Sequence, residues 1–228
     1  MRKLILLICC ISTFLGTYAK NPVSPGSNMT NFTLKSTNGE TISLADFQGK
    51  NVMLVFPRGK VGEHWCNICH YQYAELAELE AIQQFRKKYD IEVLYILPYN
   101  EAEVKHWVSI FPSQLAIITK WKNPVNMENL SKKESDWMNL TRRLFPKDYN
   151  YAETGYPMPF PVLIDTDHTL SSELGIFSTD WDGSKVDQNM SSIYIVDKVG
   201  SLRFKYVSQN TFDRPQPEYL FEIMHKLL

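Results

Sequence analysis

Residues 51–70 read NVMLVFPRGKVGEHWCNICH. The stretch begins with a continuous apolar run, 51–56, which a proline ends, and this predicts a strand buried in the centre of a sheet. A polar loop, 58–64, follows, and then two cysteines three residues apart, Cys66 and Cys69. Strand, loop and cysteine pair therefore follow one another directly, and a helical pattern comes next.

The helical pattern places apolar residues at intervals of three, at Leu76, Leu79, Ile82 and Phe85. Glutamates come early in this segment and basic residues late, which complements a helix dipole. Cys66 then lies at the helix N-terminus, where a thiol pKa of about 8.5 falls to roughly 3.5–7.5. We therefore expect Cys66 to be the nucleophile and Cys69 to resolve the mixed disulfide, closing a Cys66–Cys69 disulfide.

The remaining segments predict an α/β fold with a mainly parallel sheet. They comprise a hairpin around Asn38-Gly39, a strand at 91–97, a helix at 101–110, a strand at 160–164, a helix at 169–174, a hairpin at 192–207 and a terminal helix at 217–228. Residues 111–157 fit this order poorly. We interpret them as an insertion with a helix near 132–144, packed on the domain, with a lid or a partner-binding surface as the alternatives.

The N-terminus has the pattern of an export signal. Arg2 and Lys3 precede an apolar run, 4–15, and the small residue Ala19 precedes the expected cleavage point. The run is too short for a membrane span, which needs about 20 residues. We expect a signal peptide at 1–19, a flexible leader at 20–29, a domain at 30–228, export to the periplasm or secretion, and no stable membrane span after cleavage. An uncleaved anchor and a lipoprotein are the alternatives.

Composition narrows the function further. Four cysteines occur, and Cys9 and Cys10 fall within the expected signal, so the mature chain keeps only Cys66 and Cys69. A disulfide over so short a loop constrains the unfolded chain little, which favours exchange chemistry or metal binding over a structural role. The net charge of −1 gives no sign of a nucleic-acid partner, and 13% aromatic residues argue against disorder.

The sequence Trp65-Cys66-x-x-Cys69 between an apolar strand and a helix resembles the thioredoxin superfamily. The flanking motifs resemble its alkyl hydroperoxide reductase/thiol-specific antioxidant branch, the peroxiredoxin-like redoxins. These motifs are NFTL at 31–34 with Gly39, LADFQGK at 44–50, VFP at 55–57, FPVLID at 160–165, LGI at 174–176, and IYIVD at 193–197 with Gly200.

The resemblance implies a thioredoxin-like fold with an N-terminal β-hairpin, a central mixed sheet flanked by helices, and an insertion at about 111–157. It implies an oxidoreductase with antioxidant activity that acts in cell redox homeostasis through a redox-active disulfide, without a cofactor. The partners implied are an external thiol/disulfide electron donor protein and a substrate that is a protein disulfide or a hydroperoxide.

The chain also departs from the family pattern. Glu63 stands where peroxiredoxins place a threonine, and Ser191 stands where they place an arginine or where thioredoxins place a cis-proline. Threonine and arginine orient a peroxide and stabilise its transition state, whereas general thiol–disulfide exchange depends on them less. Arg58 is a candidate replacement cation.

Other auxiliary candidates lie beside the pair. They are Trp65, His64, Glu63 and His70. A protonated His64 lowers the pKa of Cys66 and an ionised Glu63 raises it, unless both are solvated loop residues.

Two alternatives use the same residues. Cys66-x-x-Cys69-His70 matches the attachment motif for c-type haem, in which His70 serves as an axial ligand. Two thiolates and a histidine also bind Cu(I), as in a copper chaperone, with His64, His70 or His168 as the third ligand.

Overall fold

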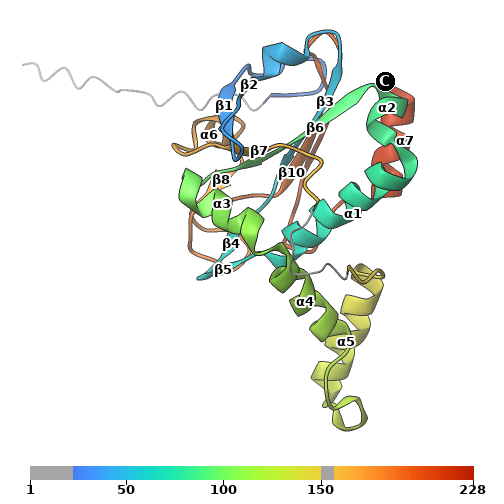
Figure 1. Cartoon of the computed structure of the whole chain (residues 1–228). Helices are drawn as coiled ribbons and strands as arrows, with labels where there is room; N and C mark the ends of the chain where they lie inside the picture. Colours follow the sequence, from blue (N-terminus) through green and yellow to red (C-terminus); the bar gives the residue numbers. More distant parts are fainter. Residues whose placement is uncertain (1–22, 150–156) are drawn as a thin grey trace, which may run out of the picture.

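The structure, a computed structural model, describes residues 23–149 and 157–228 (Figure 1). The predicted signal peptide at 1–19 and the insertion residues 150–156 lie outside the described residues. Within the described part, no helix combines the length and apolar character that crossing a bilayer needs.

A seven-stranded mixed sheet forms the centre of the molecule, in the order β11-β10-β3-β6-β7-β1-β2. Its middle strands are parallel: β3 (Asn51–Phe56), β6 (Ile91–Leu97) and β7 (Val162–Ile164). Antiparallel hairpins extend it on both sides: β10 (Ser192–Val196) with β11 (Leu202–Val207), and β1 (Thr33–Ser36) with β2 (Thr41–Ser43). The predicted buried strand and both predicted hairpins are confirmed.

Each face of the sheet buries its own core, because successive side chains of β3 point to opposite faces. Met53 and Val55 pack in the core that holds both cysteines, whereas Val52, Leu54 and Phe56 pack in the other core. The elements on the cysteine side are α1 (Asn67–Gln83), α2 (Phe85–Tyr89), α3 (Glu101–Ser109) and α7 (Pro217–Leu227). On the other side lie η1 (Leu44–Phe47) and α6 (Thr169–Glu173) (Figure 1).

The helix after the cysteines is shorter than its apolar pattern predicts. It ends at Gln83, because the C-cap residue Gln84 has a left-handed φ of 49°, and α2 starts at the residue after Gln84. Ile82, expected on the buried face, is 69% exposed, while Leu76 and Phe85 are buried. A spacing of three residues drifts around a helix of 3.6 residues per turn, and this drift turns Ile82 outward.

The insertion contains two helices, α4 (Phe111–Lys122) and α5 (Lys132–Leu144), separated by η2 (Met127–Asn129). The bounds of α5 match the prediction, whereas α4 was not predicted. Together α4 and α5 project from the body as a hairpin (Figure 1). Three residues of α4, Phe111, Leu115 and Ile118, are buried in the core that holds the cysteines, so this part of the insertion is packed, as expected.

The segment 23–29, expected to be part of a flexible leader, is bound to the β10–β11 hairpin. The N–H of Gly26 donates to the carbonyl of Leu202 (2.7 Å), and that of Met29 donates to the carbonyl of Gly200 (2.9 Å). Met29 is buried in the second core. These contacts add the segment to the domain, in contrast to the expectation.

Candidate redox site

The loop between β3 and α1 brings the cysteine pair to the end of the central strand. After Pro57 the chain turns at Gly59, whose φ is +86°, and forms the short hairpin of β4 (Lys60–Val61) and β5 (His64–Trp65). The N–H of Cys66 then donates to the carbonyl of Gly59 (2.8 Å), which closes the loop. Gly59 therefore holds Cys66 in place by a backbone contact.

Tyr99 fixes the same loop from the end of β6. Its hydroxyl accepts a hydrogen bond from the N–H of Lys60 (2.8 Å) and donates one to the carbonyl of Asp187 (2.8 Å). The ring lies so close to Gly59 that a Cβ there would overlap it. Only glycine satisfies both the close approach and the positive φ at this position.

Cys66 is the N-cap of α1, and Cys69 lies one turn inside the helix. Both thiols are free; Cys66 is 3% exposed and Cys69 is fully buried. The N–H of Cys69 donates to the carbonyl of Cys66 (3.1 Å). The pair thus lies where the sequence predicts it, with Cys66 as the outer residue.

The two thiols share one proton. The hydrogen bond between the two side chains, and burial, raise the pKa of Cys66, so the lowered pKa predicted for this residue at the helix N-terminus is wrong. Burial also raises the pKa of Cys69, but three effects outweigh it and hold that pKa at about 6: the bond from Cys66, the charge of Arg214, and the backbone N–H groups of Gly59 and Arg58. The shared hydrogen bond couples the two titrations, so the first proton lost on deprotonation belongs to the pair as a whole.

His70 joins α1 to α3 inside the core. Its Nδ1 lies 3.2 Å from the carbonyl oxygen of Cys66, and its Nε2 lies 3.0 Å from that of Trp107. The rings of Trp107 and Phe111 pack against it, each with its centroid at 4.5 Å. Burial lowers the pKa of His70 to about 4, so the imidazole is neutral at neutral pH. Its position supports packing and the orientation of the first helical turn.

The other auxiliary candidates lie along a groove next to Cys66. Glu63 and His64 are exposed, and Trp65 is half-buried with its ring edge-on to Tyr99 at 5.1 Å. The groove has a volume of about 810 Å³, and its walls include Trp65, Asn67 and, from α3, His106. The groove is lined by the sequence neighbours of Cys66 on both sides, Trp65 and Asn67, while Cys66 itself is buried.

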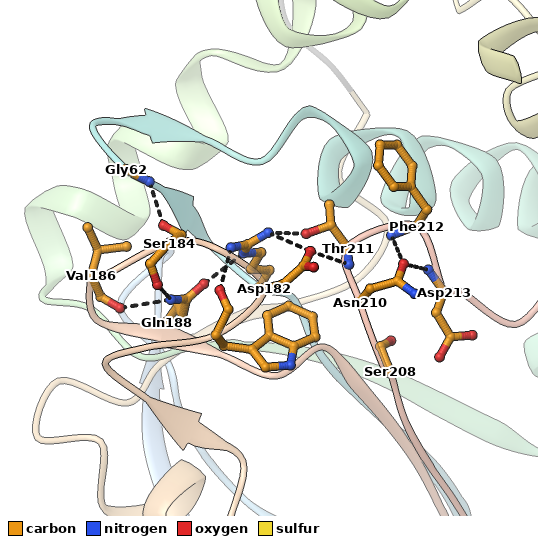
Figure 2. A network of polar contacts seen from close by, with 12 residues as sticks. Gly62, Asp182, Ser184, Val186, Gln188, Ser208, Asn210, Thr211, Phe212 and Asp213 are labelled. Carbon is orange, nitrogen blue, oxygen red and sulfur yellow. Dashed lines mark hydrogen bonds and ion pairs between the residues drawn. The ribbon is translucent and has the colours of Figure 1, made fainter. Parts of the chain in front are cut away.

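Arg58 is buried and fully engaged away from the sulfurs. Its guanidinium donates from Nε to Gln188 Oε1 (2.7 Å), from Nη2 to the carbonyl of Trp181 (3.0 Å), and from Nη1 to Thr211 and, at 3.4 Å, to Asp182. Figure 2 shows this network, in which the N–H of Thr211 also donates to Asp182 (2.7 Å). The side chain of Arg58 therefore joins three loops, while its backbone N–H faces Cys69.

Arg214 is the charged group near the pair that the sequence did not indicate. It lies in the loop between β11 and α7, and its charge lowers the pKa of both cysteines. Ser191, the position where the family places an arginine, is buried, and its carbonyl accepts the N–H of Ser208 (2.9 Å). Ser208 Oγ in turn accepts a hydrogen bond from Arg214 Nη1 (3.0 Å). No motif or spacing marks Arg214, because only tertiary contacts bring it to this place.

The donor sets considered for haem and copper do not fit this geometry. Both ring nitrogens of His70 face backbone carbonyls in a fully buried position, so neither is open to iron or copper. His64 is exposed on the hairpin, and His168 stacks on Phe177 with ring centroids 4.2 Å apart. Over residues 23–149 and 157–228, no three histidine, cysteine or acidic side chains form a group that could hold a metal ion.

Comparisons with known proteins agree with this geometry. The sequence is 35% identical over 77 residues to the thiol-disulfide oxidoreductase ResA of Bacillus subtilis (strain 168), a match that covers 32% of this chain and 40% of that protein. The match therefore spans less than half of the relative's length.

Two solved structures share the fold. A cysteine-to-serine variant of peroxiredoxin 6 from Arenicola marina has a TM-score of 0.54 at 17% identity, covering 90% of this chain and 72% of that one. Peroxidoxin BcpB from Mycobacterium tuberculosis has a TM-score of 0.51 at 11% identity, covering 90% and 96%. The model of the AhpC/TSA family matches residues 25–205, most of the chain. The resemblance seen in the motifs is thereby confirmed: the chain belongs to the AhpC/TSA family.

Proposed function

We propose that the protein is an exported thiol–disulfide oxidoreductase of peroxiredoxin-like type that uses Cys66 and Cys69 to reduce a protein disulfide or a hydroperoxide. The observation that carries this proposal is the pair of free thiols at the start of α1, which share one proton. Family membership and the similarity to a thiol-disulfide oxidoreductase support the reaction class. Export rests on the sequence of residues 1–19.

The first step belongs to Cys66, because it is the outer residue of the pair. Transfer of its proton to Cys69 along their shared hydrogen bond leaves a Cys66 thiolate. This thiolate attacks one sulfur of a substrate disulfide and expels the other as a thiolate. With a hydroperoxide, the same attack breaks the O–O bond, gives a sulfenic acid at Cys66 and expels an alkoxide or hydroxide, which takes a proton from solvent to leave as an alcohol or water.

Resolution belongs to Cys69, which lies one turn away. Its thiol gives up a proton, and the thiolate attacks the sulfur of Cys66, closes the disulfide and releases the second substrate thiolate, or water from the sulfenic acid. An external thiol donor protein then returns two electrons to the pair and is itself oxidised to a disulfide.

The groove beside Trp65 makes a protein disulfide the first substrate to test. Its volume of about 810 Å³ accommodates an extended polypeptide rather than a small peroxide alone. The departures at Glu63 and Ser191 remove groups that peroxide chemistry uses.

The test compares the wild type with Cys66→Ser and Cys69→Ser in two assays, insulin disulfide reduction and peroxide consumption, each with a reducing system supplied. We expect Cys66→Ser to lose activity and Cys69→Ser to accumulate a mixed disulfide with the substrate. If Cys66→Ser loses activity in only one of the two assays, that assay identifies the substrate class. Activity in both assays that does not change in Cys66→Ser would refute the mechanism.

A further inference from the structure

The guanidinium of Arg214 has one edge that is anchored and one that is open. Nη1 donates to Ser208 Oγ (3.0 Å) and to the carbonyls of Asn210 (3.2 Å) and Asp213 (3.0 Å). Nε and Nη2 are buried and have no hydrogen-bond partner within residues 23–149 and 157–228. Buried donors rarely stay unpaired in proteins, so an open charged edge calls for an explanation.

The nearest carboxylate in sequence, that of Asp213, is occupied by other donors. The carboxylate of Asp213 accepts hydrogen bonds from the Tyr206 hydroxyl and, at 2.6 Å, from the N–H of Gln209. Arg214 forms no ion pair with any carboxylate of the described residues, although Arg58 and Arg86 do. After the hydrogen bond from Thr211, the charge of Arg214 also lowers the pKa of the Asp182 carboxylate without a direct ion pair, so the open edge itself keeps room for another anion.

Arg214 faces the helix that carries the cysteines. It lines a cavity of about 30 Å³ together with Ile68, Gln72 and Glu75 of α1, and Ile68 lies between the two cysteines in sequence. The Glu75 carboxylate forms no ion pair with Arg214, and burial raises its pKa to about 7, which favours its neutral form. On its other side, the Ser208 link connects Arg214 to Ser191 at the start of β10. The anchored edge thus fixes the guanidinium between the end of the sheet and the start of the helix.

We propose that Arg214 is a positioning residue of the redox centre, which holds the negative charge of the reduced Cys66–Cys69 pair and thereby favours the reduced form. The inference rests on the proposed thiol–disulfide function. The step concerned is reduction of the Cys66–Cys69 disulfide by an external dithiol. The S–S bond of the pair breaks and one forms in the donor; the pair gains two electrons and one proton, and the second proton goes to solvent.

The direction of the effect follows from the charges of the two states. Arg214 lowers the pKa of both cysteines, so it stabilises the thiolate of the reduced pair. A disulfide carries no charge and gives this guanidinium nothing to stabilise. The residue therefore raises both the reduction potential and the fraction of reactive thiolate.

The experiment titrates the reduced protein by thiolate ultraviolet absorbance and by the alkylation rate with iodoacetamide, in wild type, Arg214→Met and Arg214→Lys. For Arg214→Met we expect the midpoint of the thiol titration to rise by about one pH unit, which means about tenfold less thiolate at a fixed pH below the midpoint. In Arg214→Met, the equilibrium constant of the pair with glutathione should change about tenfold in favour of the Cys66–Cys69 disulfide, which corresponds to a reduction potential lower by about 30 mV. Arg214→Lys should retain most of the wild-type titration.

Controls separate charge from structure. Arg203→Met removes an arginine that pairs with Asp197 on the far end of β11, and it should change neither readout. Ser208→Ala weakens the anchor but keeps the charge, so it should lower the urea midpoint more than it moves the titration. If Arg214→Met does not fold, Arg214→Gln, which removes the charge but keeps hydrogen-bond donors for the anchor, is titrated in its place with the same expected shift. The proposal is overturned if Arg214→Met titrates like the wild type, or if Arg203→Met shifts the titration by the same amount. Failure of the proposed function is a separate outcome, because it would be seen as unchanged activity of Cys66→Ser in the insulin and peroxide assays.

Discussion

Replacement of Gly59 by alanine tests how the loop supports the redox pair. The residue has a φ of +86°, and a Cβ there would overlap the ring of Tyr99. A left-handed conformation costs an L-residue about 1–2 kcal/mol, and overpacking of a buried site adds about 1–3 kcal/mol. We therefore expect Gly59→Ala to lose about 2–5 kcal/mol of unfolding free energy, a large share of the roughly 5–15 kcal/mol of a typical domain.

Gly62→Ala is the matched control, since it lies in the same loop at a φ of +56°. A Cβ at Gly62 would meet no atom of the described residues within 4 Å, so only the backbone strain of about 1–2 kcal/mol applies. The difference between the two variants measures the overlap with Tyr99. In a Tyr99→Ala background, this difference should largely disappear, because the colliding ring is gone.

The measurement is urea unfolding of the reduced proteins, followed by tryptophan fluorescence, together with the alkylation rate of Cys66. Gly59 contributes its carbonyl to the N–H of Cys66 and its own N–H to Cys69, so a shifted loop should also change the alkylation rate. Equal losses of stability in Gly59→Ala and Gly62→Ala would refute the steric argument. A loss of stability with an unchanged alkylation rate would refute the link between the loop and the sulfurs.

Three further changes test the surroundings of the pair. Arg58→Lys cannot replace the forked contacts to Gln188 and Thr211, and we expect a loss of about 2–4 kcal/mol in urea unfolding, whereas equality with wild type would contradict the network. His70 is neutral in the folded protein, so its contribution to the free energy of unfolding is present above pH 6.5 and is lost as pH falls toward 4. The free energy of unfolding of the wild type should therefore fall by about 3 kcal/mol over this range because of His70, and His70→Gln should lack this decrease. Burial and then the charge of Glu218 raise the pKa of Glu75 to about 7, so ionisation of Glu75 lowers the free energy of unfolding as pH rises from 4.5 through 7. Glu75→Gln should remove about 2 kcal/mol of this decrease, whereas the control Glu78→Gln should not.

Local chemistry made much of the fold predictable. The Asn38-Gly39 turn, the apolar runs of β3 and β6 and the Asp197–Gly200 turn each indicate their element without reference to the rest of the chain. The missed helix α4 had local signals too, because Pro112 is favourable in a first helical turn and Phe111, Leu115 and Ile118 form a stripe. Prolines and aromatics in that region obscured the stripe.

The site was predictable only in part, for a physical reason. Cys66 and Cys69 could be placed because strand, loop and helix are consecutive in the chain. Arg58 is bound by side chains of loops far away in sequence, and Arg214 reaches the cysteines only through tertiary contacts. No local sequence pattern predicts which of these two arginines pairs with other side chains and which keeps an unpaired edge. The sequence therefore indicated where the cysteine pair lies, while its electrostatic surroundings required the coordinates.

The reach of the Arg58 network also has a consequence for biosynthesis. Its contacts close chain segments of 130 residues to Gln188 and 153 residues to Thr211, and contacts of such long range form slowly. Residues 66 and 69 leave the ribosome long before residue 214 is made. Until the C-terminal loop docks, the two thiols lack the charge of Arg214, which lowers the pKa of both in the folded protein.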